Sequence, residues 1–526
     1  MSIRVGRPRS SPVREGRPPA PRLLLRVLAG VLSAAVALGV GHLAAALLNP
    51  VASPVLAVGS ALVDAAPTPA KELAVRTLGN ADKPVLLGSV GLVLLVVAAL
   101  LGVVAWRRPW VAYGGIALLG AAGAAAAAAR GPLADTLPSL VAGIAGVTAL
   151  RFLLSRGAVV AEHPAPTRGA AGRSRRGFLL GLGATAVVAT VTAGGGAVVG
   201  YARQAGAAAR RALTLPTPTS AAPPLPDGVQ LPGMTPFTTP SADFYRVDIS
   251  LVTPRVDAAD WSLRIDGMVD RPLTLSYQEL LAMPLIERDV TLTCVSNEVG
   301  GRYVSSGRWL GVPLREIIAR VGVQPGVDQV FTYSSDSGYT CSTPFQAVSD
   351  GRDAMVVVGL NGEVLPDERG YPARLLVPGL FGFVSATKWL ERIEFTTYAR
   401  RTAYWTARQW ATDAPVLTQS RIDVPASLGG IPRDNPVLAG VAWAQHRGIA
   451  GVEIRVDGGA WQQTRLAADG GADLWRQWSF RYDGPPGRHL AQVRARDLAG
   501  NLQPEQRTKV FPDGARGWHQ IQFTVE

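Results

Sequence analysis

The sequence predicts a multi-domain protein: an N-terminal five-helix transmembrane region, a mixed α+β domain and a C-terminal all-β sandwich of the immunoglobulin type. Three observations predict it. Five long apolar runs fill the N-terminal part of the chain. Helical and strand-like patterns alternate after them, and short strands of period two, separated by turn residues, fill the C-terminal part. A chain of 526 residues is long enough for several domains.

After a basic tail at 1–22, each apolar run approaches the ~20 residues that cross a bilayer core. The runs cover 23–48, 85–106, 110–129, 137–154 and 178–201. Arginine gathers in the tail, at Arg107 and Arg108, and between Arg151 and Arg176. Because cytoplasmic loops carry the excess of Lys and Arg, the sequence predicts a multi-pass protein of the cell membrane. Its N-terminus would be cytoplasmic and everything after the fifth helix extracytoplasmic.

The formal charge of +13 would favour nucleic acid only if it were spread over a folded domain. Residues 1–212 hold 22 Lys and Arg against 6 Asp and Glu, 22 minus 6 or +16. Residues 213–526 hold 30 against 33, a net −3. The basic excess belongs to the membrane part, so we expect no nucleic-acid partner.

Residues 174–180, Ser-Arg-Arg-Gly-Phe-Leu-Leu, directly precede the fifth apolar run. This is the pattern of a twin-arginine export signal, in an internal position. Such signals direct proteins that fold before export, usually around a cofactor. The alternative is that the arginines only follow the positive-inside rule.

His42 is the only histidine within the spans. A haem in a helix bundle usually needs two axial ligands, and the spans show no second one for it. We therefore expect His42 to be a packed polar residue, and the glycines at 194–196 to allow close helix packing. The membrane part is then an anchor, or a docking platform for a quinone-linked partner. Residues 202–240 follow as a linker, whose eight prolines after residue 212 predict a semi-rigid spacer.

The α+β domain is expected at 241–410. Residues 261–266 alternate as a strand, Ser276 and Glu279 form a capping box, and 314–321 has one apolar helix face ended by Gly322. Further strands are predicted at 327–333 and 354–358, because both are rich in β-branched residues.

The chain has two cysteines, Cys294 and Cys341. One interpretation is a disulfide, which an oxidising compartment permits. The other is a metal ligand at Cys294, because Thr-Leu-Thr-Cys ends a strand-like run before small and polar residues. No histidine lies between 164 and 445, which removes His-dependent zinc, Rieske and Ser-His-Asp sites from this domain. A metal with one protein ligand needs an organic cofactor, as the pterin dithiolene of molybdenum enzymes provides.

Several motifs also occur in the order of a known family. They are Phe244-Tyr245-Arg246, Cys294, Gly338-Tyr339 with Ser342-Thr343-Pro344, Asn361-Gly362-Glu363, Gly370-Tyr371-Pro372-Ala373-Arg374, Val377-Pro378-Gly379 and Ala386-Thr387-Lys388-Trp389-Leu390. Residues 241–396 resemble the molybdenum domain of the sulfite oxidase family, and 415–526 its dimerisation domain.

The resemblance implies a molybdenum-dependent oxidoreductase with Mo-molybdopterin as cofactor. It makes Cys294 the metal ligand and places Arg246 and Tyr339 at the substrate. The residues expected to contact the cofactor are Phe244, Tyr245, Arg246, Cys294, Arg369, Arg374, Ala386, Thr387 and Lys388. Arginine and lysine suit an anionic pterin phosphate or an oxyanion.

One departure concerns the substrate. Animal sulfite oxidases are Arg-rich after the cysteine, where this chain has residues 297–301, Asn-Glu-Val-Gly-Gly. The family also contains plant nitrate reductases and bacterial reductases of methionine sulfoxide. The paired haem histidines of a cytochrome b5 domain are missing, so a separate electron-transfer protein is expected.

The second outer domain is expected at 411–526. Residues 452–457 and 491–496 alternate with period two before turns, and 521–525 close the chain in the same way. We expect His446, His489 and His519 to be surface or packed residues. The resemblance implies a homodimer, while a membrane tether also suits a monomer.

The sequence thus predicts a membrane-anchored, extracytoplasmic oxidoreductase that transfers an oxygen atom with two electrons on a small oxyanion or sulfoxide-like substrate. The rival is a binding or adhesion protein with a Cys294–Cys341 disulfide and no metal. A transporter is disfavoured because the spans hold few ionisable residues.

Overall fold

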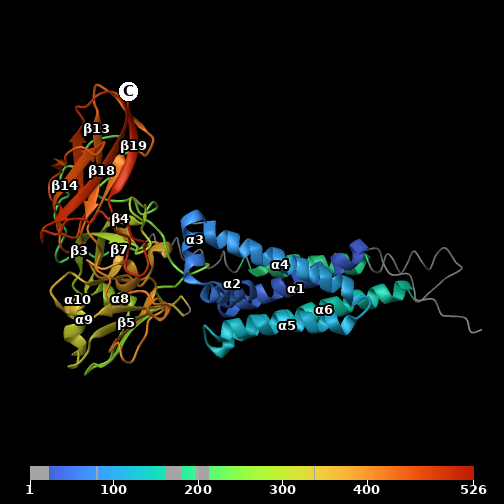
Figure 1. The fold of residues 1–526 in the computed structure, drawn as a ribbon. Coiled ribbons are helices and arrows are strands. Elements are labelled where there is room, and N and C mark those ends of the chain that lie inside the picture. Colours follow the sequence, from blue (N-terminus) through green and yellow to red (C-terminus); the bar gives the residue numbers. More distant parts are fainter. Residues whose placement is uncertain (1–22, 79–80, 162–178, 197, 199–212, 337) are drawn as a thin grey trace, which may run out of the picture. The chain divides into compact units, whose positions relative to one another are not determined.

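The computed structural model describes residues 23–526 except 79–80, 162–178, 197, 199–212 and 337 (Figure 1). The chain divides into two compact units. One contains residues 1–65 and 81–202, and the other contains 66–80, with the short helix α3 (Thr68–Leu78), and 203–526.

The first unit is helical, and among its described residues five helices are long and apolar enough to cross a membrane. This agrees with the five apolar runs of the sequence. The helices are α1 (Leu23–Leu48), α4 (Asp82–Ala105), α5 (Pro109–Ala128), the segment Leu133–Arg156 that contains most of α6 (Leu137–Ala161), and Leu179–Gly196; a shorter apolar helix, α2 (Pro54–Ala65), follows α1.

Glycine contacts let these helices approach one another closely. A Cβ on Gly30 of α1 would lie 2.8 Å from the Cα of Gly102 on α4, and one on Gly120 of α5 would lie 3.0 Å from the Cα of Gly143 on α6. Such small-residue contacts are typical of membrane helix packing. Gly196 packs against His42, whereas a Cβ at Gly194 would meet nothing, so close packing in the glycine run is confined to its end.

The α+β domain of the second unit holds two sheets. The first has the strand order β2-β1-β10-β5-β6 and the second β3-β4-β7-β8, with β9 also paired to β7. The strands are β1 (Ser262–Gly267), β2 (Leu273–Ser276), β3 (Ile286–Thr293), β4 (Val304–Pro313), β5 (Gln329–Ser334), β6 (Thr340–Pro344), β7 (Met355–Leu360), β8 (Glu363–Val364), β9 (Arg374–Leu376) and β10 (Leu390–Thr396).

Short helices connect these strands: α8 (Tyr277–Leu281), α9 (Leu314–Val321), α10 (Gln346–Ser349) and α11 (Gly382–Ser385). The capping box of Ser276 and Glu279 is present, and Gly322 ends α9 in the left-handed conformation, as the sequence predicted. The predicted strands at 261–266, 327–333 and 354–358 correspond to β1, β5 and β7.

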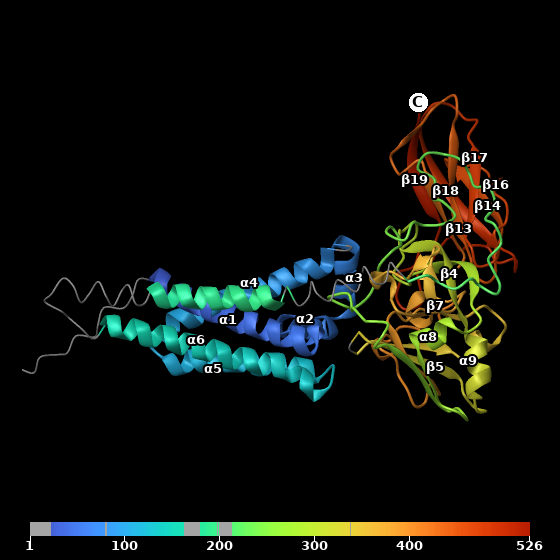
Figure 2. The same cartoon turned by 180° about the vertical axis from the view of Figure 1, so that it is seen from behind.

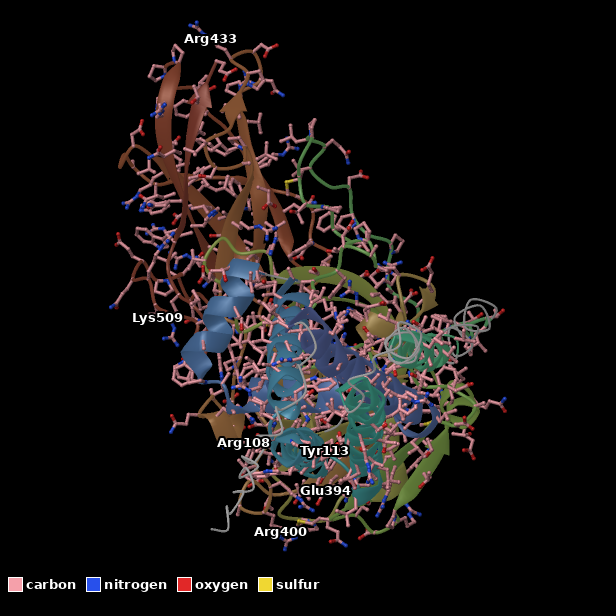
Figure 3. The ribbon with its side chains drawn as sticks, turned by 90° about the vertical axis from the view of Figure 1, so that its right-hand side faces the viewer. Arg108, Tyr113, Glu394, Arg400, Arg433 and Lys509 are labelled. Carbon is pink, nitrogen blue, oxygen red and sulfur yellow. The ribbon has the colours of Figure 1, made fainter. Side chains whose placement is uncertain are left out.

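The C-terminal part is a sandwich of two sheets (Figure 2). One has the order β11-β13-β17-β16 and the other β12-β19-β18-β14-β15, and side chains such as Leu438, Trp478, Val493 and Phe523 form a shared core. Its strands are β11 (Gln419–Val424), β12 (Gly430–Ile431), β13 (Val437–Trp443), β14 (Ile449–Val456), β15 (Gln462–Gln463), β16 (Arg465–Leu466), β17 (Arg476–Arg481), β18 (Gly487–Asp497) and β19 (His519–Val525). Arg433 and Arg400 lie at opposite ends of the second unit (Figure 3).

The composition of the Pro-rich segment predicted a semi-rigid spacer, but in the structure the segment pairs with neighbouring strands. Ser220 forms a β-bridge with Ile286, the Thr239 amide donates to the Ser306 carbonyl at 2.8 Å, and the Val229 amide donates to the Gln477 side chain at 2.8 Å. An extended Pro-rich chain keeps most of its carbonyls and some amides unpaired, so neighbouring strands can bind it.

Candidate functional site

The Cys294 thiol lies directly after β3, where the strand ends and a loop to β4 begins. The Cys294 amide donates to the Tyr303 carbonyl at 2.9 Å, and the Cys294 carbonyl accepts from the Asn297 amide at 3.0 Å. Burial raises the pKa of the Cys294 thiol, while hydrogen bonds from Ser296 and the nearby charge of Lys388 lower it. Burial outweighs these effects, so the pKa stays above its usual value, and Cys294 is a partly buried thiol with one nearby cation, Lys388, that favours the thiolate form.

Two phenol groups interact electrostatically with this thiol. Burial raises the pKa of Tyr245, and a Cys294 thiolate would raise it further, whereas Arg374 and Arg369 oppose both effects. Burial also raises the pKa of Tyr339 well above its usual value, with contributions from Cys341 and Cys294. Both phenols therefore remain protonated near neutral pH and can donate a hydrogen bond beside Cys294.

Arg369 and Arg374 are buried guanidinium groups, 7% and 5% exposed. Arg374 donates to the carbonyls of Arg369 at 3.2 Å and Ala386 at 3.4 Å, and its guanidinium lies 5.1 Å from the centre of the Trp309 ring. Burial lowers the pKa of Arg374 to about 10 and also lowers that of Arg369. In the part of the chain that the structure describes, neither forms an ion pair with a carboxylate. Buried cations bonded only to carbonyls fit an anionic ligand.

Lys388 and Arg246 share one carboxylate. The Asp248 Oδ2 atom lies 2.6 Å from Lys388 Nζ and 2.9 Å from Arg246 Nε, and the Asp248 side chain is only 5% exposed. Sequence reasoning missed Asp248. Its signal was an aspartate two residues after Arg246, but nothing local indicated a partner 140 residues away.

The remaining predicted residues surround this group. Phe244 is buried and packs edge-on against Trp309 with ring centres 5.3 Å apart. Ala386 supplies the carbonyl that Arg374 binds, and Thr387 is buried with its hydroxyl 2.7 Å from that of Thr332. The structure therefore places all ten predicted site residues in one connected neighbourhood of the α+β domain: Phe244, Tyr245, Arg246, Cys294, Tyr339, Arg369, Arg374, Ala386, Thr387 and Lys388.

Cys341 is a free thiol, as is Cys294, so the predicted disulfide alternative is wrong. Cys341 lies on β6, is fully buried and donates to the Phe383 carbonyl at 3.2 Å. The β6 pairing with β5 and the contact with α11 fix this position on a different element from Cys294.

The C-terminal sandwich supports the loop that follows Cys294. The Gln445 side chain donates to the Thr291 carbonyl and the Thr293 hydroxyl, both at 2.9 Å. The Arg421 guanidinium donates to the Gly301 carbonyl at 2.8 Å, and Gly300 packs directly on the His519 ring. His519, which the sequence gave no role beyond packing, thus contacts the loop after the thiol.

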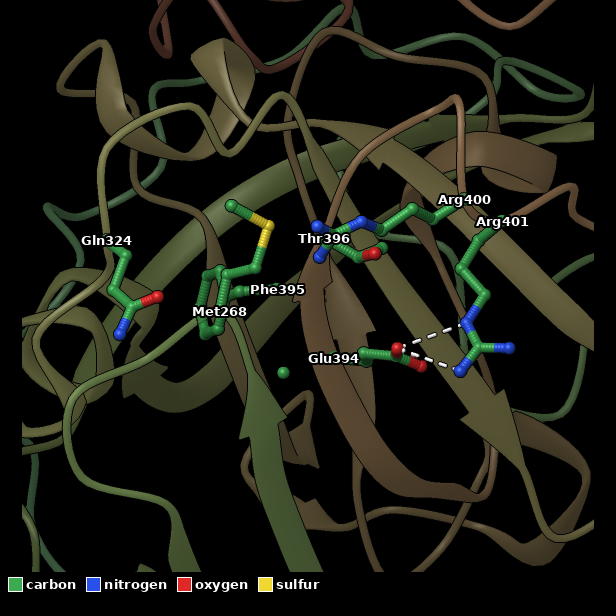
Figure 4. A pocket seen from close by; sticks show the side chains of 8 residues that line it. Met268, Gln324, Glu394, Phe395, Thr396, Arg400 and Arg401 are labelled. Carbon is green, nitrogen blue, oxygen red and sulfur yellow. Dashed lines mark hydrogen bonds and ion pairs between the residues drawn. The ribbon is translucent and has the colours of Figure 1, made fainter.

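A separate pocket of about 520 Å³ lies beside β10 (Figure 4). Its Glu394 carboxylate is already bound by the Tyr333 hydroxyl at 2.6 Å and by Arg401 at 3.0 Å. It contains none of the predicted site residues; its lining is Gly267, Met268, Gln324, Glu394, Phe395, Thr396, Arg400 and Arg401.

The donor set fits a metal that brings most of its own ligands. Among the described residues, no group of three or more His, Cys, Asp or Glu side chains could hold a metal ion. A single soft thiol at Cys294, with Lys388 acting on it and buried arginines beside Tyr245, suits a metal carried by an anionic organic cofactor. Arg369 and Arg374, which bind only carbonyls, would hold its anionic groups.

The α+β domain matches a known domain family, and the chain is similar to several known proteins. Residues 250–405 match the oxidoreductase molybdopterin binding domain family. The chain is 28% identical over 319 residues to sulfite oxidase of Gallus gallus, covering 51% of this chain and 68% of that protein. It is 32% identical over 210 residues to a nitrate reductase [NADH] of Brassica napus, covering 35% of this chain and 22% of that protein. A solved structure, the sulfane dehydrogenase SoxCD from Paracoccus pantotrophus, aligns at 24% identity with a TM-score of 0.47, covering 57% of this chain and 88% of that one.

The chain therefore carries an oxidoreductase molybdopterin binding domain and is a molybdenum-dependent oxidoreductase with Mo-molybdopterin as its cofactor, similar to the sulfite oxidases and nitrate reductases.

Proposed function

We propose that this enzyme transfers an oxygen atom with two electrons on a small oxyanion or sulfoxide-like substrate, with Cys294 as the protein ligand of the molybdenum. The observation that carries this proposal is the grouping around one thiol. The phenols of Tyr245 and Tyr339 both interact electrostatically with Cys294, and the buried arginines Arg369 and Arg374, which bind carbonyls, interact in turn with Tyr245.

The overall reaction balances as XO plus two protons and two electrons giving X plus water, or the reverse. The bound metal supplies the two-electron oxygen chemistry. The chain's own residues bind and orient the substrate and cofactor. Tyr339 can donate a hydrogen bond to a substrate oxygen, because burial keeps its phenol protonated. Arg246 is the partly exposed cation, with 26% of its side chain accessible, so it is suited to meet the substrate.

We also propose that the five apolar helices anchor the enzyme in the cell membrane, with the catalytic domain outside the cytoplasm. The helix lengths and the arginine distribution support this orientation. Electrons would pass to or from a separate protein, cytochrome or quinone-linked. The resemblance of the C-terminal sandwich to a dimerisation domain, of immunoglobulin type, supports a homodimer.

The decisive experiment is Cys294→Ser, compared with wild type after purification from a host that makes the cofactor. Molybdenum and pterin content are measured by elemental analysis and fluorescence of the oxidised pterin. Activity is measured as sulfite oxidation with a dye acceptor, and as sulfoxide or nitrate reduction with a reduced dye. We expect the variant to keep its pterin and lose activity by more than about a thousandfold, which is over 4 kcal/mol of transition-state stabilisation. An active Cys294→Ser enzyme would refute the assignment.

A further inference from the structure

Asp248 is a buried carboxylate in the middle of the basic residues of the site. One of its oxygens, Oδ2, binds both Lys388 Nζ at 2.6 Å and Arg246 Nε at 2.9 Å. Lys388 lies over the Trp389 ring, 4.7 Å from its centre, and its charge reaches the Cys294 thiol. Asp248 therefore fixes two cations that the site would otherwise present to an anion.

The local backbone supports this arrangement. Trp389 has a positive φ of 51°, and its indole donates to the Asp367 carbonyl at 2.8 Å. Gly370 lies against the aliphatic part of Lys388, where a Cβ would sit 3.0 Å from the Lys388 Cα and Cβ atoms. A non-glycine residue in the left-handed region is held by its surroundings, so the direction of Lys388 is determined rather than adjustable.

The negative charge of Asp248 affects which anions can bind at the site. An anion that contacts Arg246 or Lys388 also approaches the Asp248 carboxylate, because all three groups are in hydrogen-bond contact. A like charge disfavours a charged group, and a fixed charge within about 4–6 Å shifts an ionisation equilibrium by roughly one to three powers of ten. The repulsion acts on each negative charge of the ligand, so it is larger for a dianion than for a monoanion and absent for a neutral ligand.

We propose that Asp248 is a positioning residue that sets the charge preference of this site. It holds Arg246 and Lys388 in place and favours oxygen-donor or oxygen-acceptor substrates with no more than one negative charge over dianions. This inference rests on the proposed function, since it concerns the same site.

The test is isothermal titration of purified, molybdenum-loaded protein with sulfate, nitrate and dimethyl sulfoxide as dianionic, monoanionic and neutral probes. In Asp248→Asn we expect sulfate to bind about tenfold more tightly than in wild type, and dimethyl sulfoxide to bind equally. Asp266→Asn is the matched control, because Asp266 also binds two arginines, Arg264 at 2.5 Å and Arg392 at 2.8 Å, outside the site. It should leave all three affinities unchanged.

Unchanged or weaker sulfate binding in folded Asp248→Asn would overturn the proposal. If Asp248→Asn does not fold, two other measurements still test the charge preference. Asp248→Glu, which keeps the charge, should retain the wild-type order of affinities, and wild type itself should not bind sulfate more tightly than nitrate. Tighter sulfate binding by wild type refutes the charge preference. Failure of the proposed function looks different, because the protein would then lack molybdenum or oxygen-transfer activity with every substrate.

Discussion

Gly300→Ala tests whether the C-terminal sandwich holds the loop that carries Cys294. Gly300 has a φ of +75°, and a Cβ there would lie 3.0 Å from the His519 Cγ and closer still to two other ring atoms. His519 cannot easily move away, because its Nδ1 accepts the Ile422 amide at 3.0 Å and the ring is mostly buried. The loop must therefore shift if the methyl group is added.

Two effects lower the free energy of unfolding when alanine replaces Gly300: the strain of a left-handed backbone and the overpacking against His519. A left-handed backbone costs a non-glycine residue about 1–2 kcal/mol, and overpacking adds typically about 1–3 kcal/mol. Gly326→Ala is the matched control, since Gly326 has a φ of +87° and nothing within 4 Å of a built Cβ. We expect Gly326→Ala to lower the free energy of unfolding by about 1–2 kcal/mol. Gly300→Ala should lower it by about 2–5 kcal/mol, the sum of both ranges, and reduce activity with molybdenum still bound.

The measurements are urea unfolding, molybdenum content and dye-linked activity. His519→Ala added to Gly300→Ala should recover part of the loss, because the clash partner is gone, whereas it should not rescue Gly326→Ala. If Gly300→Ala and Gly326→Ala have the same stability and activity, the sandwich does not position the loop.

Three further predictions follow from single groups. Cys341→Ser should retain activity and molybdenum, because the serine hydroxyl can replace the thiol as donor to the Phe383 carbonyl, 3.2 Å from the sulfur; loss of the metal would show a ligand role. Burial lowers the pKa of His519 from its usual 6.5 to about 4, so the unfolded chain binds the proton more tightly. Stability should thus be fully present above pH ~6.5 and fall by about 3 kcal/mol as the pH drops toward 4, and His519→Gln should flatten this dependence in urea titrations relative to wild type. Replacing Arg175 and Arg176 by Lys should leave the outer domain inaccessible to protease on intact spheroplasts, because the receptor reads the guanidinium pair; normal exposure would contradict the export signal.

Local patterns in the sequence were sufficient for the elements that carry the thiol. The strand-like run before Cys294 and the capping box of Ser276 depend on neighbouring residues only, so local composition and cap chemistry predict them. The apolar runs were predictable for the same reason, because length and composition decide whether a helix can cross a bilayer. The twin-arginine segment lies outside the described residues and stays a prediction.

Contacts between distant segments could not be predicted in this way. Asp248 meets Lys388 across 140 residues of sequence, and no local pattern at either position indicates the other. His519 meets Gly300 because the sandwich packs on the loop after β3. The Pro-rich segment pairs with β3 at Ser220, although its composition favours an unpaired chain.

The two buried arginines of the site bear on whether the cofactor is inserted before or after export, which the twin-arginine pattern of the sequence also concerns. Arg369 and Arg374 have depressed pKa values because burial disfavours their charge, and in the described structure they bind carbonyls instead of carboxylates. An anionic cofactor would supply the missing charge, so its binding should stabilise the folded domain by mass action. That stabilisation is available only where the cofactor is made and inserted. A domain that gains its stability on cofactor insertion is best exported already folded, and this is the kind of protein that a twin-arginine signal would carry.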